Sequence, residues 1–195
     1  MTYYDPDSGA FGALGHGITD SDTALLMPFS SGSILASTVK AVKKGTAGEA
    51  GELRGDFDLT GDLGDLYANT NSGIFGTLSP CELTEQMGQA LPVADPDEVH
   101  TGAATSAPMW MGTPSGSMTL KLLKVSAGAF DGRELLISVT DPELIDTTGG
   151  IVQGMSGSPI LQNGKLVGAV THVLVNDPTC GYAISIERML EEMTN

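Results

Sequence analysis

The segment with the clearest chemical potential is a serine between small residues near the C-terminus. It reads Gly154-Met155-Ser156-Gly157-Ser158-Pro159. Small residues on both sides of Ser156 let the backbone turn tightly, so that the serine hydroxyl stands exposed. The backbone N–H groups of Gly154 and Ser156 can then point into one pocket and bind the oxyanion of a tetrahedral intermediate. The segment predicts a nucleophilic serine with an oxyanion hole; the alternative is an ordinary turn of glycine and serine.

A serine nucleophile needs a general base, and the chain has 3 histidines. His16 ends a short apolar run and lies between two glycines, which keeps its ring accessible. It also precedes the serine and lies in the first part of the chain, so His16 is the expected base. His172 falls on a predicted strand after the serine, where it would line a substrate cleft with Thr171 and Val173. His100, in the irregular middle of the chain, is expected to be structural.

The elements that must position these residues are clearest after the serine. A β-hairpin is predicted with arms at 159–161 and 165–173, around the type I′ turn signal Asn163-Gly164. A strand at 181–185 follows. Apolar residues at helical spacing then predict a terminal amphipathic helix: Ile186, Met189, Leu190 and Met193.

Before the serine, the pattern predicts mainly short strands separated by turns. Strand-like segments are 11–15, 33–42, 52–61, 71–76, 117–127 and 134–140.

The serine segment and the elements after it resemble those of chymotrypsin-like peptidases in type and order. The chymotrypsin-like loop is Gly-Asp-Ser-Gly-Gly-Pro, and this chain has Met155 and Ser158 at the Asp and second Gly positions. The resemblance implies an all-β, chymotrypsin-like double β-barrel with a C-terminal helix. Residues 1–195 would form a single serine peptidase domain, with a first lobe at about 1–78, a connection at 79–114 and a second lobe at 115–195.

The acid of a catalytic triad has several candidates. Asp20 and Asp22 lie close to His16 in sequence, and Asp141 ends a predicted strand shortly before the serine. Other aspartates occupy the region of the first lobe where a chymotrypsin-like fold would keep its acid: Asp56, Asp58, Asp62 and Asp65. The residues alone leave this choice open.

Composition and charge exclude several classes of protein. The chain is 41% hydrophobic, and its 26 glycines suit short strands and tight turns rather than long helices. A net charge of −15 would repel nucleic acid and anionic lipid headgroups, and it either keeps the protein soluble or favours basic partners. No apolar stretch reaches the roughly 18 residues of a membrane span. Met1 leads into polar residues, so no signal peptide is expected.

The two cysteines, Cys81 and Cys180, fit no metal-ligand spacing. No metal or cofactor is expected, and the cysteines could form one disulfide or remain two thiols.

Three longer motifs closely resemble the SpoIVB sporulation serine peptidase family. They are 12–16 with Asp20 and Asp22 following, 148–160, and 168–173 with 176–179 following. The resemblance implies Ser156 as the nucleophile and His16 as the histidine, and it places the proposed acid of the family at Asp141. A strict chymotrypsin-like topology would not take its acid so close before the serine, so Asp20 and Asp22 remain alternatives.

The resemblance also implies a biological role. Members of that family act in the signalling that releases an active late mother-cell sigma factor. An endopeptidase is therefore expected that cleaves a membrane-associated regulatory protein, and also itself, in the space between the forespore and mother-cell membranes. Such proteins carry an N-terminal membrane anchor and a PDZ domain, and neither is visible here, so the chain is expected to be the peptidase domain alone.

A second hypothesis belongs to a different class. The same fold could serve as a binding or regulatory module with little turnover, if Met155 and Ser158 distort the oxyanion hole. Retention of both Ser156 and His16 argues against it, because a pure binding module has no need of the pair.

Overall fold

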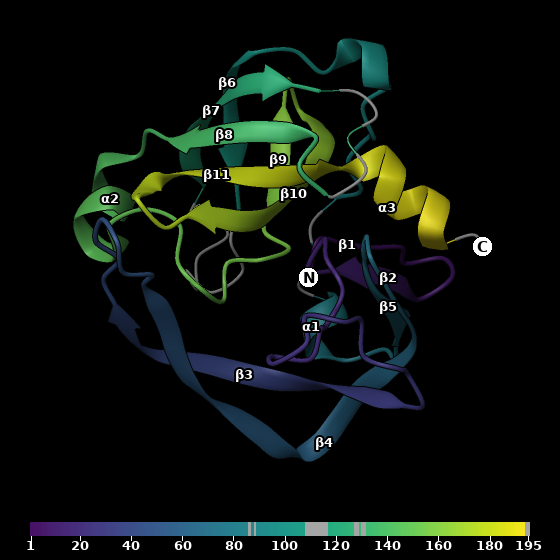
Figure 1. The fold of residues 1–195 in the computed structure, drawn as a ribbon. Coiled ribbons are helices and arrows are strands. Elements are labelled where there is room, and N and C mark those ends of the chain that lie inside the picture. Colours follow the sequence, from purple (N-terminus) through teal and green to yellow (C-terminus); the bar gives the residue numbers. More distant parts are fainter. Residues whose placement is uncertain (86, 88, 108–116, 127–128, 130–131, 194–195) are drawn as a thin grey trace.

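The chain is described from a computed structural model, which covers residues 1–85, 87, 89–107, 117–126, 129 and 132–193. These residues form two β-sheets and a few short helices (Figure 1). The mostly-β class and the C-terminal helix are therefore confirmed. None of the helices in these ranges has the length and apolar character to cross a membrane.

The N-terminal sheet is a curled half-barrel. Its five strands lie in the order β1-β2-β5-β4-β3 and are antiparallel to their neighbours. Their bounds are β1 Tyr3–Tyr4, β2 Ala10–Ala13, β3 Gly32–Lys43, β4 Glu52–Thr70 and β5 Gly73–Leu78. The expected first lobe is thus an open sheet, whereas the second lobe is closed.

The C-terminal sheet is a closed barrel of six strands in the order β10-β11-β8-β7-β6-β9. The strands are β6 Gly102–Ser106, β7 Met118–Val125, β8 Leu135–Val139, β9 Pro159–Gln162, β10 Lys165–Leu174 and β11 Asp177–Ser185. Alternation explains why these segments form strands. In β7, Met118, Leu120 and Leu122 are buried in the barrel core, whereas Thr119 and Lys121 are exposed.

The predicted hairpin and terminal helix are confirmed. Asn163 has φ 53° and Gly164 has φ 77°, the two positive values that a type I′ turn requires. Helix α3 spans Ile186–Met193 and buries Ile186 and Met189. These two side chains pack with Phe75 of the N-terminal sheet and Ile184 of the barrel, so α3 helps to join the two sheets.

The stretch 79–114, expected to be a connection, also contributes a barrel strand. β6 pairs with β7 and β9 and closes the barrel. Residues 108–114 of that stretch lie outside the described residues. Short helices that the sequence pattern did not predict are α1 Glu82–Glu85, the 3-10 helix η1 Pro96–Glu98 and α2 Pro142–Thr148.

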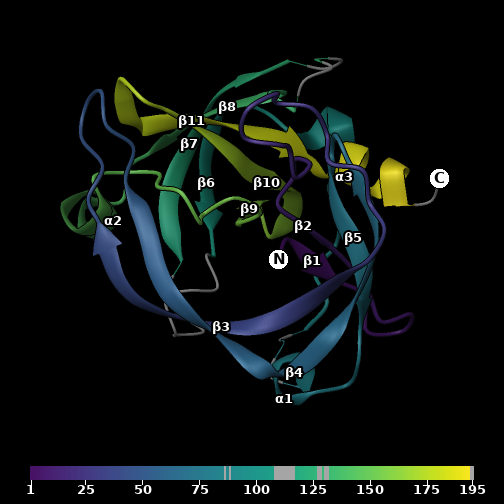
Figure 2. The same cartoon turned by 60° about the horizontal axis from the view of Figure 1, so that its bottom comes forward.

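Backbone hydrogen bonds dock the half-barrel onto the barrel. Leu53 N–H donates to the Gln153 carbonyl at 2.9 Å, and Gln153 N–H donates to the Gly51 carbonyl at 2.9 Å. Gly45 N–H donates to the Thr148 carbonyl at 2.8 Å. Figure 2 shows β3 and β4 arching past the barrel on this side, next to the segment before β9. The segment that leads into the candidate serine is thus held by both sheets.

Candidate active site

The loop that carries Ser156 is a tight turn between the half-barrel contact at Gln153 and strand β9. Gly154 has φ 98° and Gly157 has φ 82°, conformations that side chains rarely adopt. Gly157 N–H donates to the Val170 carbonyl at 2.8 Å, so the loop is fixed to β10. A Cβ at Gly157 would lie 2.5 Å from the Leu14 backbone nitrogen, so glycine is required there.

The two backbone N–H groups of the predicted oxyanion hole differ in their hydrogen bonding from the other N–H groups of the loop. Met155 N–H donates to the Val152 carbonyl at 3.1 Å, and Ser158 N–H donates to the Met155 carbonyl at 3.0 Å. Across the ranges that the structure describes, the N–H groups of Gly154 and Ser156 have no backbone acceptor. These are the two groups that an oxyanion hole would use.

Met155 and Ser158, the two departures from the chymotrypsin-like loop, both point inward. Met155 is 1% exposed and belongs to the barrel core, while the Ser158 hydroxyl donates to the Met155 carbonyl at 2.6 Å. Both side chains therefore stabilise the turn from beneath, leaving Ser156 at the surface of the loop.

His16 follows β2 through a left-handed turn. Leu14 has φ 67° and Gly15 has φ 72°, and Gly15 N–H donates to the Ala13 carbonyl at 2.9 Å. The His16 Nδ1 atom lies 2.9 Å from the Gly17 carbonyl oxygen. Because a carbonyl can only accept, this contact favours a hydrogen on Nδ1, and in the neutral ring Nε2 then carries the lone pair.

Close packing brings the His16 turn to the Ser156 loop. Leu14 abuts Gly157, and a Cβ at Gly15 would lie 2.9 Å from the Thr171 Cγ2 atom. The Ser156 hydroxyl donates to the Thr171 carbonyl at 3.1 Å, so the serine and the turn that carries His16 both lie against Thr171. This serine bond goes to a carbonyl rather than to the His16 ring, as is common before substrate binds.

The candidate acids make other contacts. Asp141 caps helix α2: one carboxylate oxygen accepts from Glu143 N–H at 3.1 Å and Leu144 N–H at 3.0 Å, and the other from Thr119 N–H at 3.3 Å. Asp20 accepts from the backbone and hydroxyl of Thr23, and these bonds lower its pKa.

Within the described residues, no recorded hydrogen bond joins His16 to any of the candidate aspartates. Asp22 is exposed, as are the four aspartates of β4: Asp56, Asp58, Asp62 and Asp65.

The predicted cleft residues lie beside the serine. A cavity of ≈ 210 Å³ is lined by Ser156 together with Thr171, His172 and Val173 of β10. The His172 ring lies 5.5 Å from the His16 ring, centroid to centroid. His100 instead contacts the Glu98 carbonyl through Nδ1 at 2.8 Å and is exposed.

Sequence reasoning missed Asn69, which holds the loop after His16. Its side-chain oxygen accepts from Ile18 N–H at 2.8 Å, and its amide group donates to the carbonyls of Ile18 and Met27 at 2.9 and 3.1 Å. The only sequence signal is an amide residue near the end of a long strand. That signal is weak, since the partner loop lies about 50 residues away in the chain.

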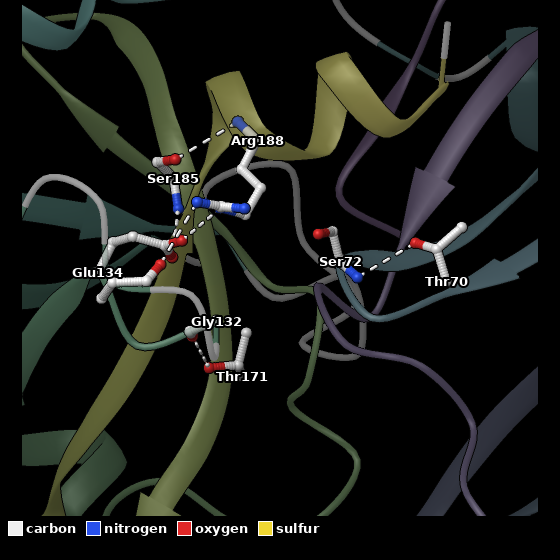
Figure 3. Close-up of polar contacts among 8 residues, drawn as sticks. Thr70, Ser72, Gly132, Glu134, Thr171, Ser185 and Arg188 are labelled. Atoms are coloured by element: carbon white, nitrogen blue, oxygen red, sulfur yellow. Dashed lines mark hydrogen bonds and ion pairs between the residues drawn. The ribbon is translucent and has the colours of Figure 1, made fainter. Parts of the chain in front are cut away.

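Sequence reasoning also missed a buried ion pair between Glu134, which directly precedes β8, and Arg188 of α3. Glu134 is 4% exposed, and the Arg188 Nε atom lies 2.7 Å from its carboxylate (Figure 3). Arg188 also donates to the Ala129 carbonyl at 3.4 Å. In the same loop, the Gly132 carbonyl accepts from the Thr171 hydroxyl at 3.2 Å (Figure 3). The pair thus fixes the residues directly before β8, close to the strand beside the serine.

The described residues hold no group of three or more His, Cys, Asp or Glu side chains that could bind a metal ion. Cys81 and Cys180 are not joined in a disulfide. The groups that could do chemistry here are the Ser156 hydroxyl beside the cavity, the His16 imidazole on the turn packed against the Ser156 loop, and the two backbone N–H groups of that loop.

Comparison with protein families gives one match. The family described as SpoIVB peptidase S55 matches residues 1–190. No curated protein matches the chain.

Proposed function

Since the chain belongs to the SpoIVB peptidase S55 family, and so is a serine peptidase of sporulation signalling, we propose that Ser156 is its nucleophile and His16 its general base. The observation that carries this proposal is the packing of the His16 turn against the Ser156 loop, with Leu14 abutting Gly157 and Gly15 abutting Thr171.

The proposed reaction begins with the proton on Ser156. His16 accepts it on Nε2, the nitrogen left free by the Nδ1 contact with Gly17, while the serine oxygen attacks the scissile carbonyl. The N–H groups of Gly154 and Ser156 stabilise the oxyanion that forms. His16 then gives the proton to the leaving amine, and water hydrolyses the acyl-serine in a second round of the same steps.

The substrate backbone is proposed to bind along β10. Strand β9 pairs with β10 only up to Ala169, so β10 continues beyond its β9 partner at Thr171, His172 and Val173. An extended segment can add there as a further strand, in register with the serine. This arrangement supports an endopeptidase, because a strand-like segment of the substrate lies along the cleft.

We further propose the biological setting that the family suggests. The substrate is a membrane-associated regulatory protein, and also the peptidase itself, exposed between the forespore and mother-cell membranes. Its cleavage leads to release of the late mother-cell sigma factor in active form. The chain has 24 acidic residues and 9 basic ones, and this negative charge supports protein rather than nucleic acid as the partner.

A fluorophosphonate probe tests the proposed chemistry directly. We expect the folded chain to be labelled at one residue, and peptide mapping by mass spectrometry to place the label on Ser156. Labelling at another serine would refute the assignment. A folded protein that is not labelled would instead favour the regulatory module with a closed or distorted site.

The family resemblance implies Asp141 as the acid, whereas its contacts in the structure are those of a helix cap, and substitution separates the two roles. Asp141→Asn keeps a side-chain acceptor at the cap, whereas Asp141→Ala should cost about 1 kcal/mol of stability. Because His16 Nδ1 already has the Gly17 carbonyl as a partner, we expect Asp141→Asn to retain kcat within about tenfold. A loss of about 10⁴-fold, with stability unchanged, would instead establish Asp141 as the acid.

A further inference from the structure

The cavity beside Ser156 has a floor of buried aliphatic side chains. Ile151 is 3% exposed, Val152 is 2% exposed and Val170 is 1% exposed. They come from the segment before the serine loop and from β10, so the floor and the nucleophile belong to one continuous structure.

The rest of the cavity lining is more polar than these three side chains. Gln153, His172 and Val173 lie there, alongside Thr171. Among the described residues that line the cavity, none is Asp, Glu, Lys or Arg. This is notable in a chain with a net charge of −15, because the acidic side chains gather elsewhere.

The floor is held rigidly. Ile151 N–H donates to the Pro178 carbonyl at 2.7 Å. A Cβ at Gly181 would lie 2.6 Å from the Ile151 Cδ1 atom, so the absence of a side chain at 181 provides the space that Ile151 fills. The shape of the cavity is therefore set by packing before any substrate arrives.

Size and polarity together select a class of side chain. An apolar cavity of roughly 150 Å³ is enough to hold benzene, so ≈ 210 Å³ has room for a leucine, methionine or phenylalanine side chain. A lysine or glutamate side chain would place its charge against these aliphatic groups, with no Asp, Glu, Lys or Arg side chain in the described lining to balance it, which is unfavourable.

We propose that this cavity receives the side chain of the residue before the scissile bond, and that the peptidase selects a medium-sized apolar residue there. The inference rests on the proposed function, since it takes Ser156 as the nucleophile that attacks the carbonyl of the scissile bond. Ile151, Val152 and Val170 are then the residues that set specificity.

The test uses peptidyl diphenyl phosphonates of the form succinyl-Ala-Ala-X, with X an analogue of Leu, Phe, Val, Lys or Glu. The Ser156 oxygen forms a bond to phosphorus and phenoxide leaves. The rate of this reaction therefore reports how well the side chain of X fits the cavity. We expect the Leu and Phe probes to react at least about 100-fold faster than the Lys and Glu probes.

A parallel reaction with the small fluorophosphonate separates the two proposals. If fluorophosphonate labels the protein but a Lys or Glu probe reacts as fast as the Leu probe, only the proposed specificity is overturned. If fluorophosphonate labels the protein but no peptidyl probe reacts, the proposed specificity is overturned as well. Absence of fluorophosphonate labelling in folded protein overturns both the specificity and the proposed function.

A matched pair of variants links the preference to this cavity. Val152→Ala enlarges the floor, and we expect the Phe-to-Val ratio of reaction rates to rise about tenfold. Val139→Ala removes the same atoms from a valine that is 3% exposed in the same core but outside the cavity. It should leave the ratio unchanged. An unaltered ratio in the Val152 variant would contradict the assignment.

Discussion

Replacing Ser156 or His16 with alanine is expected to lower kcat for hydrolysis of a succinyl-Ala-Ala-Leu thiobenzyl ester by about 10⁴- to 10⁶-fold. Without the hydroxyl there is no nucleophile, and without the imidazole the hydroxyl keeps its proton at the moment of attack. The two residues act as one unit, so the double variant should be little slower than either single variant. Additive losses would contradict a coupled pair.

Neighbouring residues of the same types serve as controls. Ser158 lies two residues further along the same loop, but its hydroxyl is buried and bonded to the Met155 carbonyl. His100 is exposed and does not line the cavity. Ser158→Ala and His100→Ala should therefore retain most of the activity. If a folded Ser158 variant were as inactive as the Ser156 variant, the assignment of Ser156 as the nucleophile would be in conflict with the result.

Replacing Arg188 with methionine is expected to destabilise the protein by about 3–5 kcal/mol, because it leaves the Glu134 carboxylate buried without its charge partner. At about 2–4 °C per kcal/mol for a domain of this size, the loss should lower Tm by roughly 6–20 °C. Thermal unfolding followed by circular dichroism measures it. A change below about 1 kcal/mol would show that the carboxylate reaches water or another partner.

Two further variants isolate the cause of that loss. Glu134→Leu combined with Arg188→Met removes both charges and should recover most of the stability, since an apolar pair of similar size avoids the uncompensated charge. Arg54→Met breaks an ion pair with Glu52 whose side chains are 61% and 44% exposed. It should cost less than about 1 kcal/mol, as is usual for surface pairs.

Local signals account for the elements that the sequence predicted well. The Asn163-Gly164 turn and the apolar spacing of Ile186 to Met193 each depend on residues close together in the chain, so the hairpin and α3 appear where expected. Strand β6 was missed because Gly102–Ser106 consists of small residues with little β-branched or aromatic character. Its strand conformation comes from pairing with β7 and β9.

The site could be predicted in part, because some of its signals are also local in the chain. The small residues around Ser156 signal a tight loop by themselves, whereas the nearness of His16 depends on contacts such as Leu14 with Gly157 across the two sheets. Asp141 was predicted only as a triad acid, and the structure also makes it the N-cap of helix α2. Helix α2 is only 7 residues long, so the pattern gave no reason to expect a cap. Asn69 and the pair of Glu134 with Arg188 depend wholly on tertiary contacts.

The two proposed catalytic side chains come from opposite sides of the junction between the sheets. His16 follows a strand of the half-barrel, and Ser156 precedes a strand of the closed barrel. Each half holds one component, and neither contains a complete reaction centre. Fragments cut in the segment between β5 and β6 would form a natural two-part complementation system. Turnover by a mixture of such fragments would measure how tightly the halves associate, and a ligand that separates the two halves would abolish activity.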